Sequence, residues 1–245
     1  MKTIHILLPV YNEERRLESG LNRLIPFMEE HFKGRYLLTV VDNGSTDKTG
    51  AIAGSFAAKY STLHYMRIPE KGLGVAFRSG CAVNKEDIVG YMDIDLATDI
   101  KGLLDTKSIF DADSTVDIVS ASRYAKGAKV IGRKWYRSIT SYGWMFILKL
   151  SFGVKFTDSI AGFIFLKKAV ADELIAGSSD DAGWFYLIEL LIRAERKSCI
   201  IKEIPAIWTD DPDTKVKLFK VIGNYLRSIA KLKATFRKEA RRTAV

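Results

Sequence analysis

Short apolar runs alternate with stretches of helical periodicity in the first half of this sequence, and this alternation most constrains its fold. Residues 4–10, 36–41 and 63–68 read as strands, and apolar residues recur at helical spacing between the first two. The first run is almost continuously apolar, as parallel strands buried on both faces are. Strand, helix, strand in this order predicts a parallel sheet with right-handed crossovers. We therefore predict an α/β fold, with a Rossmann-like, mostly parallel sheet flanked by helices.

The composition fits a soluble globular protein. The chain has 245 residues, 47% hydrophobic and 27% charged, which suffices for one large α/β domain. Cys81 and Cys199 are far apart in the sequence, which favours reduced thiols in a cytosolic protein over a disulfide framework. The three histidines lack metal-ligand spacing, so we expect no zinc site. No apolar run reaches the length of a membrane span or resembles a signal peptide, so we expect neither.

Polar residues follow the predicted strands at their carboxyl ends, where ligands of parallel sheets bind. The ones before the fourth strand are Pro9, Tyr11, Glu13, Asp42, Lys71 and Gly72. The segment 71–74 could bring backbone N–H groups and a cation toward phosphates, or its glycines could only pack at a helix start. The sequence leaves these two interpretations open. Together the strand ends predict one shared crevice.

A fourth apolar run, 88–92, ends in two carboxylates one residue apart, Asp93 and Asp95. Residues two apart on an extended chain point to the same side, so we expect both carboxylates to project together. Two adjacent anions favour a cation between them, and Mg²⁺ or Mn²⁺ takes one or two carboxylates and completes its shell with phosphate and water oxygens. The alternative is a solvated strand end without a metal.

Four motifs in this order resemble family 2 glycosyltransferases with the GT-A fold. They are Leu8-Pro9-Val10-Tyr11-Asn12-Glu13, Val40-Val41-Asp42-Asn43-Gly44-Ser45-Thr46-Asp47, Lys71-Gly72-Leu73-Gly74 and Asp93-Ile94-Asp95. Within that family the chain most resembles polyprenyl-phosphate hexose synthases, which make dolichyl-phosphate mannose or glucose. The match runs from about residue 4 to about residue 225. It implies an inverting, metal-dependent transfer of a hexose from a nucleotide sugar to a polyprenyl phosphate.

The resemblance also implies a donor site. Carried over by position, its residues are Pro9, Tyr11, Glu13, Asp42, Lys71, Gly72, Asp93, Ile94, Asp95 and Lys215. The first four would hold the nucleoside, and Asp93 and Asp95 would serve the ribose, the diphosphate and the metal ion. Lys215 and Lys71 would add positive charge near the leaving diphosphate. Asn43 replaces an acidic residue that is usual in the family, a mild departure.

Arginines in the second half of the chain are predicted to bind the acceptor phosphate. A lipid phosphate is already anionic near pH 7, so orientation matters more than a general base, and the planar arginine fork suits this task. Arg123 and Arg137 are the predicted binding residues, with Ser141 as a weaker one. The alternatives are a structural ion pair for Arg123 and a solvated face for Arg137. Asp93, Asp95, Arg123 and Arg137 are the predicted catalytic residues.

Two further acidic residues lie in segments that match the family. Asp158 would be a base if the acceptor were a sugar hydroxyl, and otherwise it caps a turn or orients an arginine. Glu189 matches a Glu-Leu-Leu segment, but Leu187 replaces the acidic residue expected before it. The role of Glu189 is therefore open.

The residues after Asp95 bear on the sugar. Mannose-type enzymes usually carry Leu-Gln there, whereas this chain has Leu96-Ala97-Thr98, which is similar to glucose-type synthases that use UDP-glucose. Because the Ala97 side chain cannot bind a metal, phosphates and water would complete the coordination shell. This favours a UDP-hexose donor over GDP-mannose.

The positive charge is concentrated at the C-terminus. From residue 215 onward there are ten Lys or Arg and one acidic residue, whereas the rest of the chain is neutral. We divide the chain into a GT-A catalytic domain, 1–212, and a basic amphipathic helical tail, 213–245. A basic amphipathic helix is typical of an anionic membrane surface, and the alternative is a packing helix with a solvated basic face. The aromatic-rich segment 135–152 could supply a second interfacial contact.

We therefore expect a peripheral enzyme on the cytoplasmic face of a membrane, and the need for a membrane protein partner is open. Nucleic acid is not expected, because the body of the chain has neither a basic excess nor a reader motif. Two rival functions remain: transfer to a saccharide or another hydroxyl, and a catalytically silent nucleotide-sugar-binding protein. The paired carboxylates at Asp93 and Asp95 argue against the silent protein.

Overall fold

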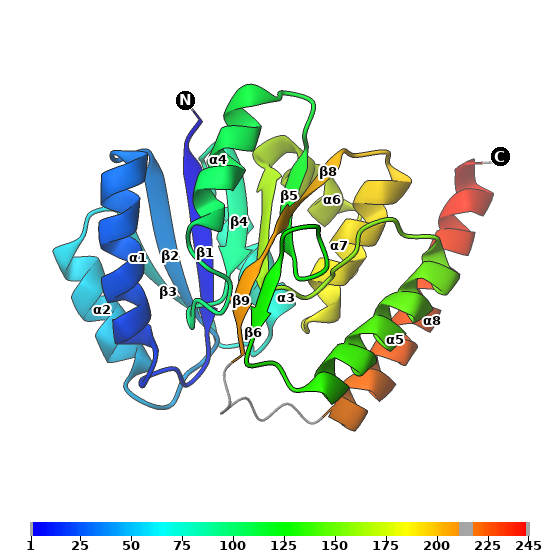
Figure 1. The fold of residues 1–245 in the computed structure, drawn as a ribbon, viewed down its shortest axis with the longest axis horizontal. Coiled ribbons are helices and arrows are strands. Elements are labelled where there is room, and N and C mark those ends of the chain that lie inside the picture. The colour runs from blue at the N-terminus through cyan, green and yellow to red at the C-terminus, as the bar shows by residue number, and fades with distance from the viewer. Residues whose placement is uncertain (1, 211–217, 244–245) are drawn as a thin grey trace.

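The computed structural model describes residues 2–210 and 218–243, and a seven-stranded sheet lies at its centre (Figure 1). The strand order is β3-β2-β1-β4-β7-β5-β8, with β6 and β9 forming a separate two-stranded pair. The strands are β1 (Ile4–Val10), β2 (Tyr36–Asp42), β3 (Leu63–Arg67), β4 (Ile88–Met92), β5 (Ile118–Ser122), β6 (Lys129–Ile131), β7 (Phe163–Lys167), β8 (Ile201–Pro205) and β9 (Ile207–Thr209).

Eight helices flank this sheet in the described residues. They are α1 (Leu17–Phe32), α2 (Thr49–Lys59), α3 (Leu73–Ala82), α4 (Gly102–Ala112), α5 (Trp135–Phe152), α6 (Lys168–Ala176), α7 (Phe185–Arg196) and α8 (Leu218–Thr243). Helices α1, α2 and α4 pack on one face of the sheet, and α3, α6 and α7 pack on the other. The predicted α/β fold with a mostly parallel sheet is confirmed.

Strand β1 lies in the interior of the sheet, between β2 and β4. It pairs in parallel with β2 on one side and with β4 on the other. Strand β7 runs antiparallel to both β4 and β5. Since β1, β2 and β4 are parallel neighbours, their carboxyl ends meet at one edge of the sheet, and the chain order reverses there. The fold thus brings these strand ends to one edge of the sheet, and the shared crevice stays a prediction.

The alternating side chains of the central strands divide the core into two layers. On β1, Ile6 and Leu8 point toward α1, whereas Leu7 points toward α3 and α7. All three are fully buried, as the continuous apolar run predicts for a strand covered on both faces. Cys81 is buried in the second layer and is not in a disulfide.

Helices α5 and α8 lie side by side beyond the second layer (Figure 1). Trp144 of α5 contacts Tyr225 of α8 with ring centroids 4.8 Å apart, and Phe152 contacts Phe236 at 6.0 Å. The predicted C-terminal helix is therefore present, and it packs on the body. None of the described helices has both the length and the apolar character required to cross a bilayer.

Candidate active site

The paired carboxylates lie in a turn beyond β4 rather than on the strand. Strand β4 ends at Met92, and the Leu96 amide donates to the Asp93 carbonyl at 3.1 Å. Leu96 adopts a left-handed conformation with φ of 54°. Our expectation of an extended chain at Asp93 and Asp95 was wrong, because a tight turn reverses the backbone there. The two carboxylates are nevertheless close enough for Asp95 to perturb the titration of Asp93.

The environment of Asp93 disfavours an isolated negative charge. Burial, then the neighbouring Asp95 carboxylate, raise the pKa of Asp93 to about 7, although the Tyr91 hydroxyl donates to it at 3.0 Å. Gly162 closes one side of the group, since a Cβ atom at that position would lie 2.0 Å from Asp93 Oδ2. Two adjacent carboxylates, of which Asp93 has a raised pKa, suit a divalent cation.

The protein supplies few other ligands for such an ion. Within residues 2–210 and 218–243, no group of three or more His, Cys, Asp or Glu side chains forms a metal cluster. Mg²⁺ and Mn²⁺ commonly bind one or two carboxylates and take their other oxygens from phosphates and water. Asp93 and Asp95 therefore fit an ion that binds together with a diphosphate.

Arg16 joins this site, although the sequence analysis did not select it. Its guanidinium donates to both carboxylate oxygens of Glu13, at 2.7 and 2.9 Å, and lies 3.8 Å from Asp95. Glu13 and Asp95 are thus linked through one cation. The signal in the sequence was the three-residue spacing from Glu13, which brings side chains together in a helical first turn.

The segments that follow β1 and β3 meet where the Lys71 side chain stacks on the Tyr11 ring. The Lys71 ammonium lies 3.3 Å from the centre of the Tyr11 ring, which is 38% exposed. Gly72 lies against the backbone of Ala182, where a Cβ atom would come within 2.0 Å of the carbonyl oxygen. The close packing against Ala182 therefore explains the glycine at position 72. Lys71 and Tyr11 lie at the edge of the sheet where a ligand would bind. Pro9 is half-buried two residues earlier.

Asp42 is fully buried at the end of β2. Its carboxylate accepts hydrogen bonds from the Ser45 amide at 2.7 Å and from the Tyr65 hydroxyl at 2.8 Å. These bonds hold the turn after β2 in place. The predicted contact of Asp42 with a nucleoside stays a prediction.

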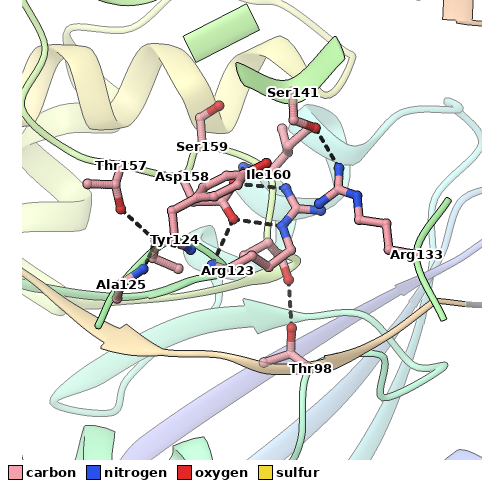
Figure 2. Close-up of polar contacts among 12 residues, drawn as sticks. Thr98, Arg123, Tyr124, Ala125, Arg133, Ser141, Thr157, Asp158, Ser159 and Ile160 are labelled. Atoms are coloured by element: carbon pink, nitrogen blue, oxygen red, sulfur yellow. Dashed lines mark hydrogen bonds and ion pairs between the residues drawn. The ribbon is translucent and has the colours of Figure 1, made fainter. Parts of the chain in front are cut away.

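Arg123 and Asp158 form a buried bidentate ion pair (Figure 2). Arg123 Nε and Nη2 donate to the two carboxylate oxygens at 2.7 and 2.9 Å, and the Arg123 amide donates at 3.1 Å. Asp158 therefore orients the arginine and also accepts from the Ile160 amide. The prediction that Asp158 caps a turn or orients an arginine is confirmed, since it does both. The guanidinium lies 5.2 Å from the Trp208 ring.

Arg133 is the second guanidinium of this cluster, and the sequence analysis did not select it. It lies 5.5 Å from the Trp208 ring and donates to Ser141 Oγ at 2.5 Å (Figure 2). Burial, then the charge of Arg123, lower the pKa of Arg133. Arg133 Nε and the Tyr124 hydroxyl are both buried, and within the described parts of the chain neither makes a hydrogen bond to a residue outside this pair.

Two neighbouring guanidiniums beside a buried tyrosine hydroxyl are groups that can bind an anion. The signal for Arg133 was its place just before a helix N-terminus, where the helix dipole disfavours a basic residue unless something else holds it. We did not use this signal.

Arg137 and Lys215 complete the set of predicted cations. Arg137 lies on α5 and pairs with Asp210 at 2.5 Å. Its carbonyl accepts from Arg133 at 3.0 Å, so Arg137 lies next to the cluster with its charge engaged elsewhere. Lys215 lies outside the described residues.

The acidic turn and the arginine cluster are neighbours. Thr98, three residues after Asp95, donates to the Ala161 carbonyl at 2.7 Å and pairs with Trp208, the ring shared by Arg123 and Arg133. A small cavity nearby is lined in part by Tyr91 and Gly162, which contact Asp93, and by Asp158, which binds Arg123.

Glu189 lies apart from this site and is fully buried on α7. It accepts from Arg193 Nε at 2.7 Å and from the Ser179 amide at 2.9 Å. Arg193 also donates to Glu239 of α8 at 3.1 Å. Glu189 thus links three segments of the fold.

A mostly parallel sheet with paired carboxylates after its fourth strand defines a GT-A type of glycosyltransferase fold. The crystal structure of glucosyl-3-phosphoglycerate synthase from Mycobacterium tuberculosis with phosphoglyceric acid shares this fold, with a TM-score of 0.67, 19% identity, and coverage of 96% of this chain and 80% of that one. A complex of the same enzyme with Mn²⁺, UDP-glucose and phosphoglyceric acid has a TM-score of 0.63, 18% identity, and coverage of 94% and 78%.

The family model described as glycosyl transferase family 2 matches residues 5–175, and this chain belongs to that family. It is similar to dolichyl-phosphate glycosyltransferases. The dolichyl-phosphate beta-glucosyltransferase of Saccharomyces cerevisiae is 27% identical over 88% of this chain and 69% of its own length. The dolichol-phosphate mannosyltransferase of Pyrococcus furiosus is 29% identical over 94% and 63%.

Glycosyltransferase AglD of Haloferax volcanii is 27% identical over 89% of this chain but only 35% of its own length. The chain thus spans from about a third to about two thirds of the curated relatives named here.

Proposed function

We propose that this protein is an inverting glycosyltransferase that moves a hexose from a nucleotide sugar to a polyprenyl phosphate at a membrane surface. The observation that carries the proposal is the buried pair formed by Arg133 Nε and the Tyr124 hydroxyl beside the guanidinium of Arg123. Trp208, which lies beside both arginines, pairs with Thr98, and Thr98 follows the acidic turn of Asp93 and Asp95. One site suits a donor diphosphate with its metal ion, and the other suits an anionic acceptor.

The donor occupies the edge formed by β1, β2 and β4. Tyr11 and Lys71 provide an aromatic ring with a cation stacked on it, and Glu13 connects through Arg16 to Asp95. UDP-glucose is the favoured donor. The Leu96-Ala97-Thr98 turn supports this choice, as do the relatives named dolichyl-phosphate beta-glucosyltransferase.

Asp93 and Asp95 hold Mg²⁺ or Mn²⁺ in this proposal. The ion, when bound, stabilises the negative charge that develops on the leaving diphosphate. Tyr91 orients Asp93 through the hydrogen bond at 3.0 Å, and the Ala97 amide holds Asp95 at the same distance. Solved structures of the neighbouring glucosyl-3-phosphoglycerate synthase contain Mn²⁺ or Mg²⁺ with UDP, which supports the assignment.

The acceptor phosphate lies against Arg123, Arg133 and Tyr124. Asp158 is a poor general base, because its carboxylate already accepts three hydrogen bonds from Arg123 and one from Ile160. An acceptor that is already anionic needs orientation rather than deprotonation. The arrangement thus favours a phosphate acceptor over a sugar hydroxyl.

The membrane location rests on the acceptor and on charge. A polyprenyl chain partitions into lipid, and the C-terminal helix carries a basic face that attracts an anionic cytoplasmic leaflet. We keep the peripheral, cytoplasmic-face location as part of the proposal. A membrane protein partner would be compatible with it.

The test is an incubation with radiolabelled UDP-glucose, GDP-mannose or UDP-GlcNAc, with and without polyprenyl phosphate and Mn²⁺. We expect label from UDP-glucose in the organic phase, dependent on both additions. Label in an aqueous saccharide instead would support a hydroxyl acceptor. Donor binding without any transfer would indicate a silent nucleotide-sugar-binding protein, and either result would overturn the proposal.

A further inference from the structure

Helix α5 exposes an apolar face that nothing in the described structure covers. The large hydrophobic side chains on its outer face are 42–77% exposed, which is unusual for one helix. We define the α5 stripe as Trp135, Ile139, Tyr142, Phe146 and Leu150, which are 75%, 60%, 60%, 67% and 77% exposed.

The α5 stripe is one continuous surface. At 100° per residue its five side chains fall within an arc of about 80°. Ser141, Trp144 and Leu148 lie on the opposite side and are buried against the body. The helix therefore has one face for the protein and a separate apolar face for something else.

Within residues 223–241, helix α8 does not offer a comparable surface. Its apolar side chains Ile229, Leu232 and Phe236 are 4–6% exposed because they pack on the second layer of the core. Among residues 223–241, Leu226 is the exposed large hydrophobic side chain. Arg227, Lys231 and other basic residues occupy the outer side. Residues 223–241 of α8 thus present charge, whereas α5 presents apolar side chains.

The chemistry around the α5 stripe favours an anionic lipid surface over a protein partner of mixed charge. Between Asp117 and Asp158 the chain contains eight Lys or Arg and no acidic residue. Tryptophan and tyrosine, at 135 and 142, are side chains typical of the boundary between lipid and water.

The α5 stripe also continues into the proposed phosphate site. The Tyr142 ring packs on Tyr124 with centroids 4.8 Å apart, and Ser141 beside it binds Arg133. A lipid phosphate held by Arg133 would therefore have the start of its hydrocarbon chain next to Tyr142.

We propose that α5 lies in the interface of an anionic bilayer, with the α5 stripe inserted among the lipids and the basic face of α8 flanking it. The path of the acceptor chain past Tyr142 rests on the proposed function. The docking itself rests only on the exposed stripe and the surrounding charge. The apolar anchor of the protein is thus an internal helix of the catalytic body, and α8 contributes electrostatic attraction.

Vesicle flotation of the full chain tests this inference. The variant Phe146→Ser with Leu150→Ser removes two side chains that are 67% and 77% exposed, so the fold is retained. We expect wild type to float with vesicles of phosphatidylcholine and phosphatidylglycerol, and the variant to lose about tenfold or more in vesicle affinity, because binding scales with buried apolar area. The matched control, Val83→Ser with Ile200→Ser, removes exposed apolar side chains elsewhere and should float like wild type.

Fluorescence gives a second readout. In a Trp184→Phe background, brominated lipids should quench Trp135, and replacing Trp135 by Phe should remove most of that quenching. Flotation of the Phe146/Leu150 variant equal to wild type would overturn the inference. So would a wild-type protein that stays off vesicles and forms a dimer which that variant dissociates, because the α5 stripe would then join two copies of the chain.

The proposed function can fail separately. The Phe146/Leu150 variant should keep wild-type turnover on a short, water-soluble prenyl phosphate without vesicles, since neither residue contacts the phosphate site. If wild type transfers no sugar to any polyprenyl phosphate but floats in a way that depends on the stripe, the docking stands and the proposed function falls.

Discussion

Asp95 is the carboxylate whose role can be tested with the least disturbance of the fold. Its side chain is 25% exposed, and its Oδ1 accepts from the Ala97 amide, a bond that an asparagine also accepts. Removing the charge would weaken the binding of the divalent ion that we propose for this site. The residue therefore separates metal binding from folding.

We expect Asp95→Asn to lower metal-dependent sugar transfer about a hundredfold or more while the circular dichroism spectrum is unchanged. Initial rates measured against Mn²⁺ concentration provide the check. Asp99→Asn, which changes a carboxylate four residues later, should behave like wild type. Full activity of Asp95→Asn in EDTA would remove the metal from this site.

Arg133 offers a test of the phosphate site that does not depend on charge. Lysine keeps the positive charge but lacks the Nε donor and the planar fork. Arg133→Lys should raise the KM for polyprenyl phosphate about tenfold with little change in the KM for the donor, since a lost hydrogen bond to a charged group is worth about that much. Arg23→Lys, on the exposed side of α1, is the control. An unchanged acceptor KM would exclude Arg133 from the site.

His5 predicts how stability depends on pH. It is fully buried, with its ring nitrogens 3.0 Å from Asn84 Oδ1 and 2.7 Å from Thr39 Oγ1. Burial lowers the pKa of His5 to about 4. The unfolded chain therefore binds a proton at higher pH than the native protein, and stability is lost as the pH falls from about 6.5 toward 4.

The loss from this residue should amount to about 3 kcal/mol across that range. Urea unfolding at pH 7 and at pH 4.5 measures it. The variant His5→Asn should flatten the difference between the two pH values, and an equally steep dependence in the variant would assign the effect to other groups.

At the level of elements, α7 joins the segment after α6 to α8. Glu189 binds Ser179 on one side and Arg193 on the other, and Arg193 reaches Glu239 of α8. Ser228 of α8 in turn donates to Asp181 at 3.1 Å. The next residue, Ala182, accepts from the Gly74 amide at the start of α3. The position of α8 is thus connected to the strand end that carries Lys71.

We expect Glu189→Gln to lower the free energy of unfolding by about 3 kcal/mol, because it leaves the buried Arg193 with a weaker partner. Glu173→Gln is a matched control: it removes an exposed ion pair with Lys197 and should cost below about 1 kcal/mol. Chemical denaturation of both variants gives the comparison. Equal losses would show that burial does not strengthen the Glu189 contact.

At the level of the whole molecule, α8 is part of the core despite its composition. Its buried side chains cover Trp144, Phe152 and Phe185 through ring contacts. The division into a catalytic domain, 1–212, and a tail, 213–245, stays a prediction from the sequence. The packing implies that the first part loses stability when the second is removed.

Deletion of residues 213–245 should lower the free energy of unfolding by about 5 kcal/mol or more, because Ile229, Leu232 and Phe236 each contribute about 1.5–3 kcal/mol when buried. Thermal unfolding followed by near- and far-ultraviolet circular dichroism measures this. A truncated chain as stable as the full chain would establish 213–245 as a separate appendage.

Sequence pattern determined the sheet and the place of the site. The runs at 4–10, 36–41 and 63–68 became β1, β2 and β3 with ends within one residue of those expected, since apolar periodicity is a local property. The polar residues that follow these strands lie near one another, because the carboxyl ends of parallel neighbouring strands are at the same edge of the sheet.

Only the tertiary structure decided how the charged side chains are paired. Arg123 binds Asp158 across 35 residues and Arg137 binds Asp210 across 73, so partners of this kind are set by packing between distant elements. For the same reason the sequence did not show that Arg133 lies beside Arg123, that the chain turns at Asp93, or that α5 keeps an apolar face exposed. Local periodicity identifies an amphipathic helix, but the packing of its neighbours decides which apolar face remains outside.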